Sequence, residues 1–239
     1  MSAFDHEHEQ RPQSQFDIIQ LVLKNTEVAL ELGLQAEARA EEQTALAQKM
    51  QELAELDGLT GLQNRRALEN SYTGLQTKDT RRRHRGGSNQ PVALLMADID
   101  HFKSINDGPG GHAAGDDVLK GVANVMRQSV RQRDVVSRWG GEEFALLLPR
   151  ASRKTALRVA ESIRENVAAG AFIPGAGHTQ PVTLSMGVAM VNLHEPLEMS
   201  MAKADLALYA AKHQGRDQVV FASQLPKIPK LREVELIQE

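Results

Sequence analysis

The stretch Arg138-Trp139-Gly140-Gly141-Glu142-Glu143-Phe144 decides the fold, and the apolar run Ala145-Leu146-Leu147-Leu148 follows it directly. Strand-like residues lie on both sides, at 135–137 and 144–148, which predicts a β-hairpin with acidic groups at the tip of its turn. Glycines at such a turn supply positive φ and let a ligand approach the backbone closely. Acidic oxygens there suit a hard cation such as Mg²⁺, which usually arrives with phosphates. The alternative is a solvated turn with incidental acids.

A second acidic site follows a run that reads as a buried strand. Residues 91–97 are apolar and long enough for the centre of a sheet, and they lead into Asp98-Ile99-Asp100. An aspartate at the end of a central strand can converge with an acid on a neighbouring hairpin, and two such carboxylates can bridge a pair of metals roughly 3.5–4 Å apart. The alternative is that Asp98 caps the helix after the strand.

Five segments, in order and with nearly the expected spacing, resemble the GGDEF diguanylate cyclases: residues 57–66, 98–107, 140–144, 183–189 and 204–216. The resemblance runs from about Leu56 to Phe221. It implies an α+β fold, a GGDEF domain with a central, mostly antiparallel sheet flanked by helices, as in nucleotide cyclases and polymerase palm domains. It also implies the condensation of two GTP into cyclic di-GMP with release of two pyrophosphates.

The resemblance also implies roles for residues at the metal site. Asp98 and Glu142 would bind two Mg²⁺ (or Mn²⁺) ions per active site, with the backbone carbonyl of Ile99 as a further ligand. Glu143 would lie near the ribose and assist the attacking hydroxyl, and Lys103 would take part in catalysis by meeting the triphosphate. The catalytic set is therefore expected to be Asp98, Glu142, Glu143 and Lys103.

Substrate-binding residues follow from the same resemblance. Lys103, Lys212 and Arg216 would contact the triphosphate, and Asn106 and Asp116 would read the guanine edge. A carboxylate that accepts hydrogen bonds from guanine N1 and N2 rejects adenine, because adenine offers an acceptor at N1. The sequence departs from the family by one extra residue in the Gly-rich loop 107–111 before His112, which affects how Asn106 and Asp116 meet one guanine.

A regulatory site is expected just before the hairpin. Arg131 and Asp134 stand at the position of the family's RxxD motif, through which cyclic di-GMP inhibits the enzyme. Ser162 stands where the family usually adds an arginine, with Arg158 and Arg164 nearby, so inhibition is expected to be weaker than usual. The alternative is a helix-end arginine beside an aspartate that leads into a strand.

The N-terminal part predicts one long helix, from about Ser14 to Glu55, because it has no proline there and only Gly33. A three-four spacing predicts a seam of mostly small residues that packs on a partner helix, as a coiled coil or short bundle. We expect a homodimer, since each domain holds one GTP; a solitary helix is the alternative. The seam consists of Ile19, Val22, Thr26, Ala29, Gly33, Ala36, Ala40, Gln43, Ala47, Met50 and Ala54.

The expected division is a flexible N-terminus (1–15), a helical dimerisation and signalling segment (16–56), the catalytic domain (57–221) and a C-terminal tail (222–239). Within the domain the pattern predicts a turn at 57–64. Helices are predicted at 65–76, 101–105, 116–131, 152–168 (capped by Ser152) and 197–214 (ended by Gly215). Beyond the hairpin, strands are predicted at 92–99, 182–191 and 219–221.

Composition agrees with this reading. Cysteine is absent, and no apolar run reaches the 18 residues of a membrane span, so we expect a soluble cytoplasmic protein. Residues 1–56 hold 11 acidic and 4 basic residues, which leaves the rest mildly basic, as suits a nucleotide. Aromatic residues are 4% of the chain, which does not favour nucleic-acid binding. The basic run 81–88 is predicted to be a solvated loop.

Two other functions remain open from the sequence. The chain could be a catalytically silent receptor for cyclic di-GMP through Arg131 and Asp134, or a scaffold that works through its helix. Intact Glu142, Glu143 and Lys103 favour the enzyme. A signalling partner upstream could act through the N-terminal helix, although no sensing domain is recognisable before it.

Overall fold

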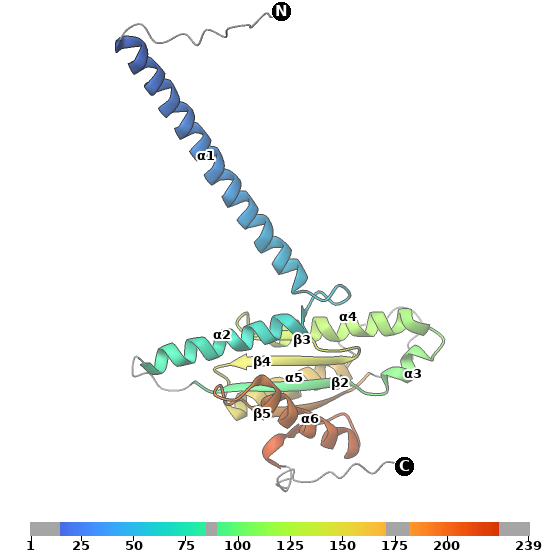
Figure 1. Cartoon of the computed structure of the whole chain (residues 1–239). Helices are drawn as coiled ribbons and strands as arrows, with labels where there is room; N and C mark the ends of the chain where they lie inside the picture. Colours follow the sequence, from blue (N-terminus) through green and yellow to red (C-terminus); the bar gives the residue numbers. More distant parts are fainter. Residues whose placement is uncertain (1–14, 85–89, 171–181, 225–239) are drawn as a thin grey trace, which may run out of the picture. The chain divides into compact units, whose positions relative to one another are not determined.

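The computed structural model describes residues 15–84, 90–170 and 182–224 (Figure 1). The chain forms two compact units, residues 1–54 and 55–239. In the part described, no helix is long and apolar enough to cross a membrane. The prediction for the tail at 225–239 and for the first 14 residues lies outside the described ranges.

The first unit is the helix α1, Gln15–Ala54, which agrees closely with the predicted bounds. Forty residues correspond to a rod roughly 60 Å long. Along this helix the chain exposes large apolar side chains, among them Ile19, Val22 and Leu30. The side chains of the seam positions Ala47 and Met50 lie outside the described set. An isolated helix with this much exposed apolar surface gains most of its stability from a partner.

The second unit is built on one six-stranded sheet in the order β1-β3-β4-β2-β5-β6. The strands are β1 (Gln63–Asn64), β2 (Val92–Ile99), β3 (Val135–Arg138), β4 (Glu143–Pro149), β5 (Leu184–Met190) and β6 (Val219–Phe221). The central strand β2 pairs antiparallel with β4 and with β5, and β3 and β4 form the predicted hairpin. Only the outer pairs β1–β3 and β5–β6 are parallel. The sheet is therefore mostly antiparallel, as expected.

The helices cover both faces of this sheet. They are α2 (Arg65–His84), α3 (Phe102–Asn106), α4 (Gly111–Ser129), α5 (Arg153–Ala168) and α6 (Leu197–His213), and a 3₁₀ turn (Ala222–Gln224) ends the described chain. One core cluster joins α4 and α5 to Leu95 and Ala97 of β2, and the other joins α2 and α6 to Leu94 and Met96. The alternation of β2 side chains between the two clusters follows from the strand period of two. The fold is thus a helix–sheet–helix sandwich with β2 buried on both faces.

Several local predictions are confirmed. Ser152 caps α5 by accepting from the Thr155 N–H at 3.3 Å, and Gly215 has φ 117° after the end of α6. The α4 residues predicted to be buried, Val118, Leu119, Val122, Val125 and Met126, are at most 4% exposed.

Two predicted helix bounds are wrong. The helix α2 continues to His84, so residues 81–84 of the basic run are helical rather than a loop, and 85–89 lie outside the described residues. Cations in the last turn are favoured by the helix dipole, and Arg83 also pairs with Asp79 one turn earlier at 3.1 Å. The helix α4 begins at Gly111, five residues before the predicted start. Asp116 therefore lies inside the helix rather than at its first residue.

Candidate active site

The turn between β3 and β4 consists of Trp139, Gly140, Gly141 and Glu142. It closes because the Trp139 N–H donates to the Glu143 carbonyl at 2.8 Å. Positive φ was expected at these glycines, and this is wrong, because the described glycines in the left-handed region are at 61, 111, 170 and 215. Gly140 is needed for space instead: a Cβ there would lie 2.9 Å from Glu143 Oε2. The glycine therefore lets the Glu143 carboxylate fold back over the turn.

Strand parity and register bring three acidic residues to one end of the sheet. Asp98 lies opposite Glu143 in the antiparallel β2–β4 pair. Asp98 continues the set of β2 side chains that faces α6, and Glu143 continues the β4 set that faces the same way. Glu142 is held beside them, because the Ile99 N–H donates to its carbonyl oxygen at 3.4 Å. The alternative role of Asp98 as a helix cap is wrong, since the residue before α3 is His101.

Lys212 brings a positive charge from α6 to the same point. Its Nζ lies 2.8 Å from Asp98 Oδ2, and the Asp98 side chain is only 6% exposed. Burial raises the pKa of Asp98, although the hydrogen bond and charge of Lys212 act against this rise. Burial also raises the pKa of Glu142, and the negative charge of Asp98 adds to the effect. Lys212 thus supplies one positive charge beside the three carboxylates of Asp98, Glu142 and Glu143.

The donor chemistry of this cluster fits a hard divalent cation. Asp98 and Glu142 offer carboxylate oxygens whose pKa values are raised mainly by burial, so a bound cation would favour their ionised forms. Within the described ranges, no group of three or more His, Cys, Asp or Glu side chains could hold a metal. Mg²⁺ nevertheless commonly binds through one or two carboxylates, with water and substrate phosphates completing its shell. The residues present fit such an ion with phosphate as co-ligand.

The two candidate guanine-reading residues come from α3 and α4. Asn106 ends α3, and its side chain lies against Gly115, where an added Cβ would overlap the carboxamide oxygen. Asp116 is the next residue of α4 and is exposed. The extra residue in loop 107–111 is therefore accommodated, and Asn106 still lies beside the helical turn that carries Asp116. Sequence reasoning did not identify Gly115, whose signal is a glycine inside a helix immediately before a candidate ligand.

Of the three cations expected to contact phosphate, Lys212 is paired with Asp98, and the other two are not paired in this way. Lys103 on α3 and Arg216 after α6 are exposed, and neither forms an ion pair with another described residue. Arg216 follows Gly215 in a turn where three successive residues have positive φ: 117° at Gly215, 63° at Arg216 and 45° at Asp217. A non-glycine residue in this region is strained and persists only when its surroundings hold it. The turn that presents Arg216 is therefore a constrained one.

Asp100 supplies that constraint and was not predicted as a functional residue. This buried carboxylate accepts from the hydroxyls of Thr183 and Ser185, both at 2.7 Å, and from the Asp217 N–H at 3.1 Å. Arg164 of α5 holds the Asp217 side chain at 2.8 Å. Because its oxygens are occupied by three donors, Asp100 serves as an anchor for the Arg216 turn rather than as a metal ligand.

The candidate regulatory residues lie beside a cavity of about 240 Å³ that Arg131 and Asp134 help to line. Arg131 is exposed, whereas Asp134 Oδ2 already accepts from the Arg131 N–H at 2.9 Å. Arg164 is bound to acidic partners and cannot serve this cavity in the same conformation. Ser162 is half-buried and Arg158 is exposed on α5.

Comparison with known proteins gives one consistent result. The family profile described as "Diguanylate cyclase, GGDEF domain" matches residues 54–218. The chain is 42% identical over 166 residues to diguanylate cyclase DgcP of Pseudomonas aeruginosa, covering 70% of this chain and 24% of that protein. It is 40% identical over 181 residues to diguanylate cyclase DgcM of Escherichia coli, covering 76% and 42%. The chain thus spans less than half the length of these relatives.

Solved structures give the same family. The coiled coil and GGDEF domain of DgcB from Caulobacter crescentus, in complex with c-di-GMP, superposes with a TM-score of 0.69 at 30% identity. The match covers 81% of this chain and 99% of that one.

Proposed function

Because the chain belongs to the GGDEF-domain family of diguanylate cyclases, we propose that it condenses two GTP molecules into cyclic di-GMP and releases two pyrophosphates. The observation that carries this proposal is the cluster of Asp98, Glu142 and Lys212 at one end of the sheet. Two acids with raised pKa values beside a lysine suit a triphosphate that arrives with a divalent cation.

In the proposed reaction each GTP 3′-hydroxyl attacks the α-phosphorus of the other GTP. That bond forms as the bond to pyrophosphate breaks. Asp98, Glu142 and the Ile99 carbonyl would hold Mg²⁺, which when bound would lower the pKa of the attacking hydroxyl and neutralise charge on the leaving pyrophosphate. Lys212 stabilises charge on the phosphates from the α6 side, and Glu143 lies close enough to the same end of β2 to orient the attacking hydroxyl. Most of the rate then comes from positioning and charge stabilisation.

The remaining substrate contacts are divided between two exposed regions. Lys103 and Arg216 are free of ion pairs with other described residues, so they can bind the triphosphate without losing a protein partner. Asn106 and Asp116 read the guanine edge from adjoining turns of α3 and α4. A site built on these hydrogen bonds discriminates strongly against adenine.

The reaction needs two domains, because each presents one GTP site. We assign the pairing to α1, whose exposed apolar residues can pack on a second copy as a coiled coil. The related DgcB fragment is described as a coiled coil with a GGDEF domain, which supports this assignment. Linking two domains raises their effective concentration and so the rate of condensation. A signalling partner would act through the same helix.

Product feedback is proposed at Arg131 and Asp134. Cyclic di-GMP would meet the exposed Arg131 guanidinium through a charge-assisted phosphate contact. Asp134 Oδ2 accepts from the Arg131 N–H, and its other carboxylate oxygen would accept from the guanine edge. The serine at position 162 predicts weaker feedback than an RxxD site with a third arginine.

The function is tested by incubating the full chain with GTP and Mg²⁺ and separating the nucleotides by chromatography. Glu142→Gln should lower the yield of cyclic di-GMP at least about a hundredfold. Glu165→Gln, which changes an exposed carboxylate on α5, is the matched control and should keep the wild-type rate. A wild type that binds cyclic di-GMP without making it would instead indicate a silent receptor.

A further inference from the structure

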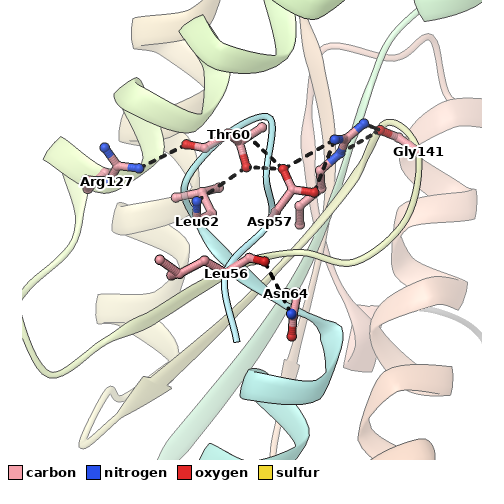
Figure 2. Close-up of polar contacts among 8 residues, drawn as sticks. Leu56, Asp57, Thr60, Leu62, Asn64, Arg127 and Gly141 are labelled. Atoms are coloured by element: carbon pink, nitrogen blue, oxygen red, sulfur yellow. Dashed lines mark hydrogen bonds and ion pairs between the residues drawn. The ribbon is translucent and has the colours of Figure 1, made fainter. Parts of the chain in front are cut away.

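Arg138, the last residue of β3, ties the acidic turn to a distant part of the chain. Its Nε and Nη2 donate to the Gly141 carbonyl oxygen at 3.0 and 2.7 Å. Its Nη1 faces the Asp57 carboxylate, 3.3 Å from either oxygen. Figure 2 shows Asp57 and Gly141 at the two ends of this link, with Thr60 on the far side of Asp57. The Arg138 side chain is only 18% exposed and the Asp57 side chain 21%.

The Gly141 carbonyl belongs to the peptide group that precedes Glu142. On the other side of Glu142, its own carbonyl accepts from the Ile99 N–H at 3.4 Å. Both peptide groups that flank this proposed metal ligand are therefore held, one by β2 and the other by Arg138. No atom lies within 4 Å of a Cβ position at Gly141, so nothing packs on that side of the residue. The guanidinium supplies the second restraint on Glu142.

Asp57 is itself held firmly. It accepts from the Thr60 N–H at 2.8 Å and from the Thr60 hydroxyl at 2.7 Å. Partial burial alone would raise the pKa of Asp57, but the Thr60 hydrogen bonds and the Arg138 charge lower it overall, so it is ionised at neutral pH. Arg127 of α4 donates to the Thr60 carbonyl at 3.1 Å and fixes the same loop from outside (Figure 2).

This loop follows directly on the long helix in the chain. Asp57 is three residues beyond Ala54, where α1 ends. The carbonyl of Glu55 accepts from the Asn64 N–H at 2.8 Å, and Leu56 forms a β-bridge with Gln63. A change in the helix that displaces residues 55–57 therefore reaches Arg138 through a single ion pair and reaches Glu142 through one more hydrogen bond.

We propose that Arg138 and Asp57 are positioning residues for Glu142, and that this ion pair is the route by which the segment after α1 sets the affinity of the acidic turn for a divalent cation. The inference rests on the proposed function, since it assigns Glu142 to the metal. It goes further by naming a residue pair outside the ligand set. Outer residues that orient metal ligands typically change metal affinity by about 10–100-fold when replaced.

The test uses the full chain carrying Arg138→Lys, Asp57→Asn, or both. Lysine keeps the charge but lacks the planar fork that reaches Gly141 and Asp57 together. Arg138→Lys should raise the Mg²⁺ concentration for half-maximal rate by about tenfold, with little change in the KM for GTP at saturating Mg²⁺. Because the two residues act in series, the double variant should be no weaker than Arg138→Lys alone.

A matched control is Lys203→Gln, which breaks another partly exposed ion pair, the 2.9 Å contact with Glu195. It should leave the Mg²⁺ dependence unchanged. Calorimetric titration of Mn²⁺ into each protein gives a readout without turnover, so a wild type that binds Mn²⁺ but makes no product would refute the proposed reaction alone. Wild-type Mg²⁺ and Mn²⁺ affinity in Arg138→Lys, or independent effects of the two substitutions that simply add, would overturn the inference.

Discussion

Replacing Gly115 with alanine would put a methyl group where the Asn106 carboxamide now lies. The added Cβ would overlap the Asn106 oxygen and come within 3.1 Å of its Cγ and 3.2 Å of Phe102 Cζ. The amide is the end of a half-buried side chain and can rotate away, whereas the buried Phe102 ring needs to move by only a few tenths of an ångström. The fold should therefore be retained, while the Asn106 carboxamide should move from its present position.

The size of the effect follows from the contact that is lost. One neutral hydrogen bond contributes about 0.5–1.5 kcal/mol, so the KM for GTP should rise about two- to twelvefold if Asn106 reads guanine. Alanine inside a helix is favoured over glycine by about 0.5–1 kcal/mol, which offsets the strain at Phe102. The melting temperature should therefore change little while the KM rises.

Two other glycine-to-alanine changes serve as controls. Gly74 in α2 has nothing within 4 Å of its Cβ position, so Gly74→Ala should leave the KM unchanged and stabilise slightly. At Gly187 the new Cβ would overlap the backbone of Ala204 and Leu208 in α6, which cannot rotate away, so the fold should lose about 3 kcal/mol or more. Initial rates over a GTP series, with thermal melts, separate the cases. A wild-type KM in Gly115→Ala would show that Asn106 does not contact the base.

Three further predictions concern pH, assembly and feedback. The pKa values of Asp98 and Glu142 are raised in the folded protein, so the metal-free fold holds extra protons and loses stability as pH rises from about 4 through the raised values. Glu142→Gln should therefore melt higher than wild type at pH 7.5 but not at pH 4, and an equal difference at both would contradict the sign. Removing residues 1–55 should leave a folded, mostly monomeric domain whose cyclase rate per chain is lower at nanomolar protein. Sedimentation measures the oligomeric state, and a dilution series measures the rate. An undiminished rate would speak against pairing through α1. Arg131→Ala should weaken cyclic di-GMP binding about tenfold to a hundredfold, because it removes a charge-assisted contact of roughly 1.5–3 kcal/mol. Equal affinity of the wild type and Arg131→Ala in calorimetry would exclude this site.

Features set by local chemistry could be predicted from the sequence. The strand β2 was found from its continuous apolar run, the Ser152 cap from its position before α5, and the end of α6 from Gly215. Each depends on neighbours in the chain, so pattern and structure agree. The sequence indicated that Asp98 and Glu142 can converge, and the antiparallel register of β2 with β4, which pairs Asp98 with Glu143, brings the turn to that end of β2.

Features set by contacts between distant segments could not be predicted in the same way. The ion pair of Asp57 with Arg138 joins residues 81 positions apart in the chain. The hydrogen bond from the Asp217 N–H to the Asp100 carboxylate joins residues 117 positions apart. The glycine at 140 was interpreted as a conformational need, whereas its role depends on where the Glu143 side chain folds. The predicted end of α2 at residue 76 is too early, because residues 77–84 are mostly polar; exposed polar residues with cations at the favourable end of the helix dipole remain helical.

The most direct test measures pyrophosphate and cyclic di-GMP in the same reaction of the full chain with GTP and Mg²⁺, over a series of protein concentrations. We expect about two pyrophosphates for each cyclic di-GMP, as the condensation requires, a rate per chain that rises to a plateau as pairs form, and no product from ATP. Pyrophosphate release without cyclic di-GMP, or no reaction of GTP at any concentration, would contradict the assignment of this chain as a cyclase.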